Sequence, residues 1–229
     1  MSDRSGSSVI RPVIETDGRA IVLDLGVASP LLADAPEPMT VQALGATIDA
    51  AMAAARTEFA YGRWGERRDL YRSAHFASDD PDRRRDIHLG VDIFCPAGTP
   101  VRSPQPGRIH AWANNARDLD YGPVIILEHD ANGGPVYTLY GHLSLDSLDG
   151  LEAGRALAGG EPFARVGRPP ENGNWPPHLH FQLILDLQGL GTEFPGVAAC
   201  ADAEKWLALS PLPAAYFADV DAAALHGRR

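Results

Sequence analysis

The stretch "NWPPHLHFQLIL", residues 174–185, decides the fold. After the two prolines, every second residue is apolar, which is typical of a β-strand. His178 and His180 lie two positions apart, so a strand would point both imidazoles to the same side, about 7 Å apart along the chain. Two histidines placed in this way can serve one metal ion or one reacting atom. The pair therefore raises the question of which other side chains meet it.

Short β-rich runs precede this stretch from Ile87 onward. They include "HLGVDIFC", "GRIHAWA", "PVIILEHD", "PVYTLYGHL" and "FARVG", and turns rich in Gly, Pro and Asn separate them. No long helical pattern lies between the runs, so we expect a mainly β fold, α+β overall, built on a largely antiparallel sheet.

The two ends of the chain have a different pattern. "AIVLDL" (20–25) is typical of a short strand, and a helix is expected after Thr40, a residue suited to the N-cap. Apolar residues then follow at helical spacing. "DAEKWLAL" (202–209) predicts a short C-terminal helix. We predict an N-terminal extension over 1–75, a catalytic domain over 76–210 and a tail over 211–229.

The charge balance limits the classes of partner. The 229 residues include 30 acidic and 20 basic side chains, for a net charge of −10, which disfavours nucleic acid or an anionic membrane as a partner. The first twenty residues lack the apolar core of a signal peptide, and no apolar stretch is long enough to span a membrane. We expect a cytoplasmic protein with free thiols at Cys95 and Cys200. Nothing in the sequence specifies an oligomeric state.

Partners for the histidine pair lie in two upstream segments. "HLGVD" places His88 and Asp92 four residues apart. A straight strand would separate them by about 13 Å, too far for one ion, so the chain must curl between them, and Gly90 permits this. "YTLYGHLS" places His142 at the end of an alternating run.

These side chains suit a catalytic zinc site, which has three protein ligands and an open fourth position. His88, Asp92 and one of the paired histidines would supply the ligands. The other paired histidine and His142 would then lie beside a zinc-activated water, where an imidazole can orient it, take up its proton or stabilise charge on an attacked carbonyl. Manganese and cobalt accept similar donors, although a His2Asp set with an open position is typical of zinc.

Three segments resemble the LytM/lysostaphin-type zinc metallopeptidase family: "HLGVDIFCPAGTPVRSPQPGRI", "VIILEHDANGGPVYTLYGHLS" and "HLHFQ". The resemblance covers residues 86–186, in order. It implies an antiparallel β-roll core of the duplicated hybrid motif type, with Zn2+ bound by His88, Asp92 and His180. It also implies that His142 and His178 are the catalytic histidines, and that the substrate is a peptide bond, most often in peptidoglycan.

Two features depart from the family pattern. The usual "STGPHLHFE" is replaced by "NGNWPPHLHFQ", so the rim of the cleft is bulkier and Gln182 stands where glutamate is common. No export signal is expected, although peptidoglycan lies outside the cytoplasm. "YGRWGERRDLYRSAHF" and "LDYGP" are similar to a subset of the family that is fused to kinase-like and class III aminotransferase-like domains. That similarity implies an intracellular small-molecule or amino-compound context.

Candidate substrate ligands come from the segment before the motif and from the rim. Arginines cluster between residues 63 and 72, and such a cluster is usually a solvated surface. The alternative is that Arg68, together with Tyr71, binds a substrate carboxylate or phosphate. Asn174 on the rim is a third candidate.

The sequence therefore predicts a zinc-dependent hydrolase that cleaves peptide or amide bonds, an enzyme of the metalloendopeptidase type. One alternative keeps the zinc chemistry but acts on a small amino or phospho-amino compound. A second alternative is a regulatory module without catalysis, which the intact set of histidines disfavours and which metal content would distinguish.

Overall fold

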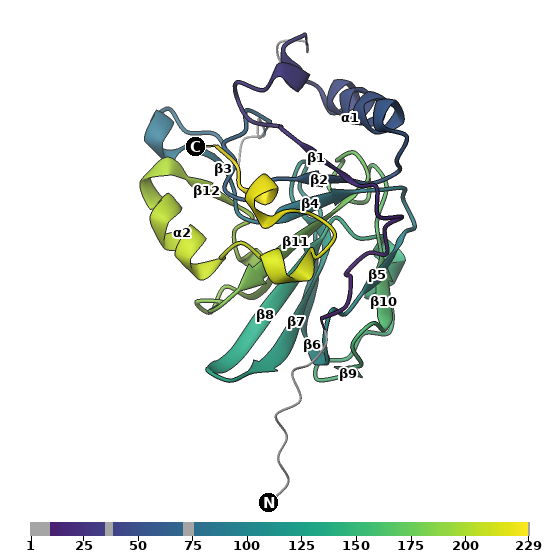
Figure 1. The fold of residues 1–229 in the computed structure, drawn as a ribbon. Helices are drawn as coiled ribbons and strands as arrows, with labels where there is room; N and C mark the ends of the chain where they lie inside the picture. The colour runs from purple at the N-terminus through teal and green to yellow at the C-terminus, as the bar shows by residue number, and fades with distance from the viewer. Residues whose placement is uncertain (1–9, 35–38, 71–75, 229) are drawn as a thin grey trace, which may run out of the picture.

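Figure 1 shows a mainly β structure in which one large sheet is flanked by two α-helices. The computed structural model describes residues 10–34, 39–70 and 76–228. Eight strands form the large sheet in the order β1-β2-β4-β11-β8-β7-β6-β9, and β10-β5 and β12-β3 form two small sheets. Neighbouring strands are antiparallel except for the parallel pair β1 and β2. The predicted fold class is confirmed.

The elements alternate with short turns along the chain. The strands are β1 (Ile21–Leu23), β2 (Ala60–Gly62), β3 (Arg85–His88), β4 (Val91–Phe94), β5 (Pro100–Arg102), β6 (Gly107–Asn115), β7 (Gly122–Ala131), β8 (Gly134–Gly141), β9 (Ala156–Leu157), β10 (Pro162–Arg165), β11 (His178–Ile184) and β12 (Val197–Ala199). The helices are α1 (Val41–Ala55) and α2 (Ala203–Leu209), with 3-10 turns at Pro30–Leu32, Pro81–Arg83, Leu145–Leu148, Gly191–Glu193, Cys200–Asp202, Ala214–Tyr216 and Ala222–Leu225.

The strand β11 holds the centre of the site. It lies between β4 and β8, with His180 opposite Asp92 on one side and opposite Gly141 on the other. The register thus brings the histidine pair beside the Asp92 strand and beside the strand that leads into His142. Almost all of β11 is buried. The strand ends at Ile184, one residue before the predicted end, and Leu185 is 46% exposed.

The helix α1 begins and ends as its sequence predicts. The hydroxyl of Thr40 accepts a hydrogen bond from the amide of Ala43 at 3.1 Å, which satisfies one of the free N–H groups of the first turn. Arg56 ends the helix in a left-handed conformation. Leu44 and Ile48 are buried, and they pack with Leu25, Phe94 and Trp175 in one apolar cluster.

The N-terminal extension is built into the large sheet. β1 pairs with β2, and β2 pairs with β4, so that Gly62 lies opposite Asp92. At the other end of the chain Leu225 is fully buried, and the Trp64 ring packs edge-on against His226 with 5.3 Å between centroids. The division at residues 75 and 210 stays a prediction, but strands from both sides of residue 75 share one sheet.

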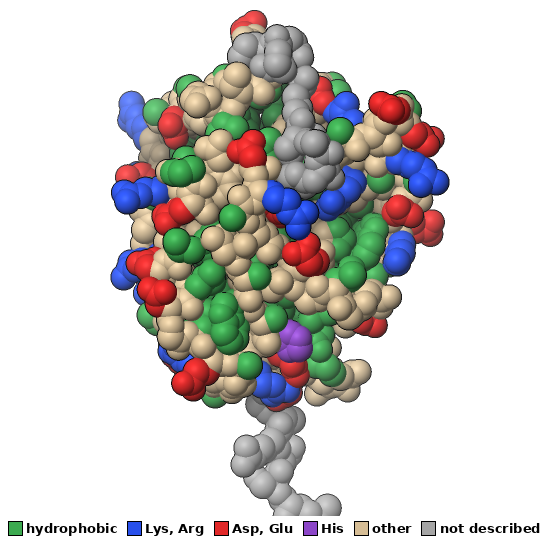
Figure 2. All heavy atoms as spheres, turned by 180° about the vertical axis from the view of Figure 1, so that it is seen from behind, with side chains coloured by type: hydrophobic (Ala, Val, Ile, Leu, Met, Phe, Trp, Pro, Cys, Tyr) green, Lys and Arg blue, Asp and Glu red, His purple; other side chains and the backbone are tan. Residues whose placement is uncertain are grey.

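The surface mixes both signs of charge. On the face seen in Figure 2, acidic and basic side chains are interspersed around apolar and uncharged atoms. Cys95 is buried and Cys200 is exposed, and both are free thiols, as expected. No helix among the described residues combines the length and the apolar character that a membrane crossing requires.

Candidate metal centre and active site

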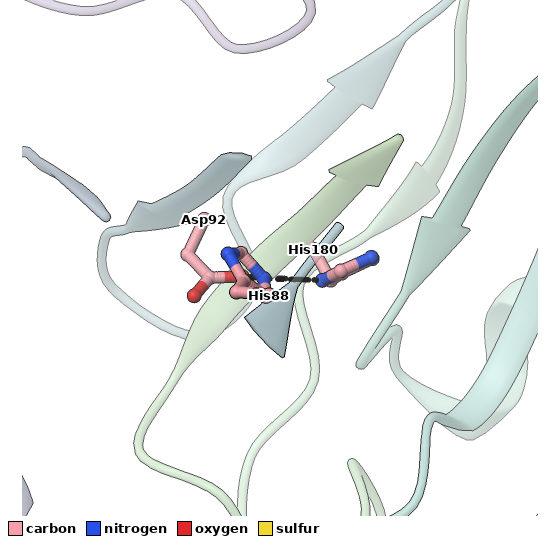
Figure 3. Close-up of side chains that lie close together, drawn as sticks. All are labelled: His88, Asp92 and His180. Atoms are coloured by element: carbon pink, nitrogen blue, oxygen red, sulfur yellow. Dashed lines mark hydrogen bonds and ion pairs between the residues drawn. The ribbon is translucent and has the colours of Figure 1, made fainter. Parts of the chain in front are cut away.

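Three predicted ligands meet at the junction of β3, β4 and β11. His88 ends β3, the chain turns at Leu89 and Gly90, and Asp92 lies in β4. The predicted curl at Gly90 is therefore present, and it brings His88 Nε2 to 3.1 Å from Asp92 Oδ1. His180 Nδ1 lies 3.0 Å from His88 Nε2 and 3.3 Å from Asp92 Oδ1. Figure 3 shows the three side chains turned toward one another.

Hydrogen bonds on the far side of each ring fix which nitrogen is a donor. His88 Nδ1 donates to the carbonyl of Arg63 at 2.9 Å, so Nε2 is unprotonated and its lone pair is free to bind a cation. His180 Nε2 donates to Gln182 Oε1 at 2.9 Å, so Nδ1 is unprotonated in the same way. The Gln182 amide nitrogen donates to the carbonyl of Pro195 and the hydroxyl of Ser210, so the amide oxygen faces His180.

This arrangement fits a cation. His88 Nε2 and His180 Nδ1 are both acceptors, yet they face each other at 3.0 Å beside a carboxylate oxygen. Such a contact between lone pairs is repulsive unless a positive ion shares them. Zinc–ligand bonds of about 2.0–2.1 Å in a tetrahedron separate the donor atoms by about 3.4 Å, close to the spacing seen here. Two imidazoles and one carboxylate form a donor set that zinc accepts.

The other two predicted histidines lie beside this cluster. The His142 and His178 rings are 4.4 Å apart between centroids, and His178 Nε2 lies 3.7 Å from Asp92 Oδ1. His142 Nδ1 donates to the carbonyl of Asn172, and His178 Nδ1 donates to that of Pro176. Each ring therefore keeps an unprotonated Nε2 that can accept a proton. His142 has a φ of 63°, a left-handed conformation uncommon outside glycine and frequent at functional sites.

Burial keeps these histidines neutral. Loss of water lowers the pKa of His88 to about 4 and the pKa of His142 well below its ordinary value. Burial also lowers the pKa of His178. For Asp92, burial alone would raise the pKa, but the neighbouring His88 and Arg68 hold it well below the ordinary value. A neutral imidazole at His88 beside the Asp92 carboxylate is the protonation state that metal binding requires of these two ligands.

We expect the metal-free protein to lose stability as the pH falls from about 6.5 to about 4. The unfolded chain binds a proton at His88 below pH 6.5, whereas the folded chain resists it down to about pH 4, so unfolding becomes easier across that window. His88 alone contributes a loss of about 3 kcal/mol, and His142 and His178 act in the same direction. Urea denaturation of chelator-treated protein measures this. A His88→Asn variant should show a shallower pH dependence, and a flat profile between pH 7 and 5 would contradict the prediction.

The predicted substrate ligands lie in three different situations. Arg68 is buried, and its guanidinium donates to Asp92 Oδ2 at 2.6 Å and to Glu66 Oε2 at 2.8 Å, so the structure gives it protein partners beside the metal centre. Tyr71 lies outside the described residues. Asn174 is exposed, and its amide donates to Asp118 at 3.0 Å. Substrate binding by these three residues stays a prediction.

A cavity of about 210 Å³ opens onto the five central residues. Its polar lining includes His88, Asp92, His142, His178 and His180. Leu25, Leu44 and Leu70 of the N-terminal extension and Trp175, which follows the cis Pro169–Pro170 bond, form part of its apolar lining. Other apolar lining residues are Phe76, Phe94, Leu119, Phe194 and Val197. The Trp175 ring lies edge-on to His178 at 6.4 Å, so the bulkier rim expected from the sequence borders the site itself.

Sequence reasoning missed the residues that support the ligands. Glu66 is 1% exposed, accepts from Arg68, and also accepts from the amide of Leu25. Gly62 lies against Arg68 and Asp92. A Cβ at Gly62 would come within 2.8 Å of Arg68 Nη2 and 3.1 Å of Asp92 Cβ. The only signal for them was the unusual "YGRWGERR" stretch, whose distance from the motif hides their contact with Asp92.

Comparisons with known proteins find similarity to one family of peptidases. Residues 86–190 match the model of peptidase family M23. DD-carboxypeptidase/endopeptidase Mpg of Neisseria meningitidis is 38% identical over 102 residues, which are 44% of this chain and 21% of that protein. The matched segment thus spans about a fifth of the length of these curated relatives.

Solved structures resemble about half of this chain. The catalytic domain of lysostaphin from Staphylococcus simulans is 26% identical, with 53% of this chain and 80% of that chain covered and a TM-score of 0.36. A prophage-encoded M23 protein, EnpA, from Enterococcus faecalis is 24% identical, with 43% and 68% covered and a TM-score of 0.35. The family match contains the HxxxD spacing, His142 and the HxH pair, so residues 86–190 of this chain are similar to peptidase family M23 over the residues of the candidate site.

Proposed function

We propose that this chain is a zinc-dependent hydrolase that cleaves a peptide or amide bond with an activated water. The observation that carries the proposal is the convergence of three lone pairs, on His88 Nε2, His180 Nδ1 and Asp92 Oδ1, within 3.0–3.3 Å of one another. A buried cluster of this kind, beside two further neutral imidazoles, has the ligands and the proton acceptors of a metallohydrolase.

When bound, zinc would be held by His88, Asp92 and His180 and would supply Lewis acidity to a water molecule and to the substrate carbonyl. His178 would accept a proton from the attacking water, since its unprotonated Nε2 lies 3.7 Å from Asp92 Oδ1, one of the proposed ligand atoms. The same proton then passes to the leaving amine nitrogen as the C–N bond breaks. His142 lies against His178, and its unprotonated Nε2 can accept a hydrogen bond from the attacking water.

Peptides are the leading substrate class. Mpg is named as a DD-carboxypeptidase and endopeptidase, and the matched segment contains the five residues on which the proposed chemistry depends. The proposal extends that relative's type of reaction to this chain, and not its particular substrate. The predicted cytoplasmic location would place the reaction away from peptidoglycan.

The cavity supports a second candidate, a compact amide that carries an apolar group. An engineered cavity of about 150 Å³ lined by aliphatic and aromatic side chains admits benzene, so about 210 Å³ leaves room for one group of leucine or phenylalanine size. The described residues give less support to a phosphorylated compound. Arg117 on the cavity wall is paired with Glu193 at 3.2 Å, and Arg68 is paired with Asp92 and Glu66.

The test is a substrate panel assayed with zinc-loaded protein, chelator-treated protein and an Asp92→Ala variant. The panel contains muropeptides, glycine-rich peptides, N-acyl amino acid amides with Gly, Leu or Phe side chains, and phospho-amino compounds. We expect one zinc per chain, hydrolysis that is lost on chelation and restored by zinc, and neither zinc nor hydrolysis in Asp92→Ala. Hydrolysis that survives chelation, or one zinc per chain with no turnover of any amide, would contradict the proposal.

A further inference from the structure

We infer that Arg68 is a positioning residue for the metal centre: it holds Asp92 as a ligand through one oxygen only. The inference rests on the zinc function proposed above. It assigns the N-terminal extension a part in metal binding, because Arg68 and Glu66 precede the segment that matches family M23.

The two oxygens of Asp92 have different surroundings. Oδ2 accepts from Arg68 Nη1 at 2.6 Å, a short charge-assisted hydrogen bond. Oδ1 faces His88 Nε2 at 3.1 Å and His180 Nδ1 at 3.3 Å. Because Oδ2 is held by the guanidinium, rotation of the carboxylate to offer both oxygens to one ion would break that bond. Asp92 is therefore directed toward binding through Oδ1, which keeps the coordination number low and a position open for water.

The guanidinium is itself fixed on its other edge. Arg68 Nε donates to Glu66 Oε2 at 2.8 Å, and both side chains are 3% exposed or less. Glu66 is anchored in turn by the amide of Leu25 at 3.2 Å. Glu66 also balances the charge of Arg68, so the pair brings no net positive charge toward a bound cation. Planar arginine suits this task because one rigid fork can bind two carboxylates at once.

The backbone of the N-terminal extension leaves space for the Arg68 guanidinium and also accepts a hydrogen bond from it. Gly62 has no Cβ, and one placed there would lie 2.8 Å from Arg68 Nη2. The carbonyl of Arg63 accepts from Arg68 Nη2 at 3.3 Å and from His88 Nδ1 at 2.9 Å. The segment 62–68 thus contacts the outer side of two of the three proposed ligands. Contacts of this kind orient the ligands, and their loss commonly weakens metal binding 10- to 100-fold.

The test compares zinc affinity, measured by competition with a chromophoric chelator, in Arg68→Met, Arg68→Lys and the double variant Glu66→Gln/Arg68→Met. The double variant removes the charges of Glu66 and Arg68 together, so Glu66 is not left as a second buried carboxylate without its partner. Arg67→Met is the matched control, because Arg67 forms a similar ion pair with buried Asp86 at 2.9 Å without touching Asp92.

We expect the single and the double variant that carry Arg68→Met to bind zinc at least 10-fold more weakly, Arg68→Lys to fall between them and the unaltered protein, and Arg67→Met to bind normally. Cobalt in place of zinc should show a weaker visible absorption in both variants that carry Arg68→Met, because a carboxylate free to bind through both oxygens raises the coordination number. If the double variant binds zinc as tightly as the unaltered protein, or more tightly, Arg68 does not position Asp92. An unaltered protein that binds no zinc would overturn the proposed function and this inference together.

Discussion

Replacing His178 by alanine is expected to lower hydrolysis by a factor of about 10² to 10⁴ while zinc binding is retained. His178 Nε2 is an unprotonated nitrogen beside Asp92 Oδ1, whereas the three converging ligand atoms belong to other side chains. The variant therefore removes the proposed proton acceptor and leaves the donor set complete. The measurement is kcat/KM on the best substrate of the panel, together with zinc content per chain.

His110→Ala provides the control for this comparison. His110 lies on β6, where it pairs with Glu128 at 2.9 Å, and it does not line the cavity. Hydrolysis by this variant should be unchanged. If His178→Ala hydrolysed amides at the unaltered rate with zinc bound, the proton would have to be accepted elsewhere. A loss of zinc together with activity would instead make His178 a ligand.

Replacing Gly90 by alanine is expected to disrupt the metal centre without removing any ligand. A Cβ at this position would lie 2.7 Å from His180 Nε2, from His180 Cε1 and from the carbonyl oxygen of Phe181. The His180 ring must then shift, which disturbs its hydrogen bond to Gln182 and the direction of its Nδ1 lone pair. We expect a loss of about 1–3 kcal/mol in the free energy of unfolding from overpacking. Zinc affinity should fall about 10- to 100-fold.

Gly133→Ala is the matched control, because a Cβ on Gly133 meets nothing within 4 Å and neither glycine has a positive φ. The measurements are urea denaturation without metal and chelator competition with zinc. Equal zinc affinity in the two variants would show that the close approach of Gly90 to His180 has no role in the site.

The central part of the site could be predicted because its signals are local. Alternation after Pro177 places His178 and His180 on one face of a strand whatever the rest of the fold is. The spacing of His88 and Asp92, with a glycine between them, is compatible with one ion only if the chain turns there, and it does. The helix α1 was equally predictable, because Thr40 and the apolar spacing after it specify the helix start and its buried face without reference to distant residues.

The supporting residues could not be predicted because their partners are distant in sequence. Arg68 is one of several arginines in a charged run, and the sequence does not distinguish the one that reaches Asp92, 24 positions later. The pairing of β2 with β4 decides this, and strands of three or four residues leave little trace in the sequence. Glu66 was missed for the same reason. The role of Glu66 is to bind the buried guanidinium of Arg68. The position of that guanidinium follows only from the pairing of β2 with β4.

The pairing of β2 with β4 also has a consequence for how this chain can be cut or recombined. A fragment starting at residue 86, where the family match begins, would leave the Asp92 strand as an open sheet edge, with backbone N–H and C=O groups free to pair with another molecule. Such an edge invites aggregation, and the same cut discards the guanidinium that holds Asp92. We therefore expect the smallest unit that folds and binds metal to be larger than the matched segment, residues 86–190. An N-terminal extension taken from a relative should be compatible with folding only if the strand that pairs with it, the counterpart of β4, is exchanged with it.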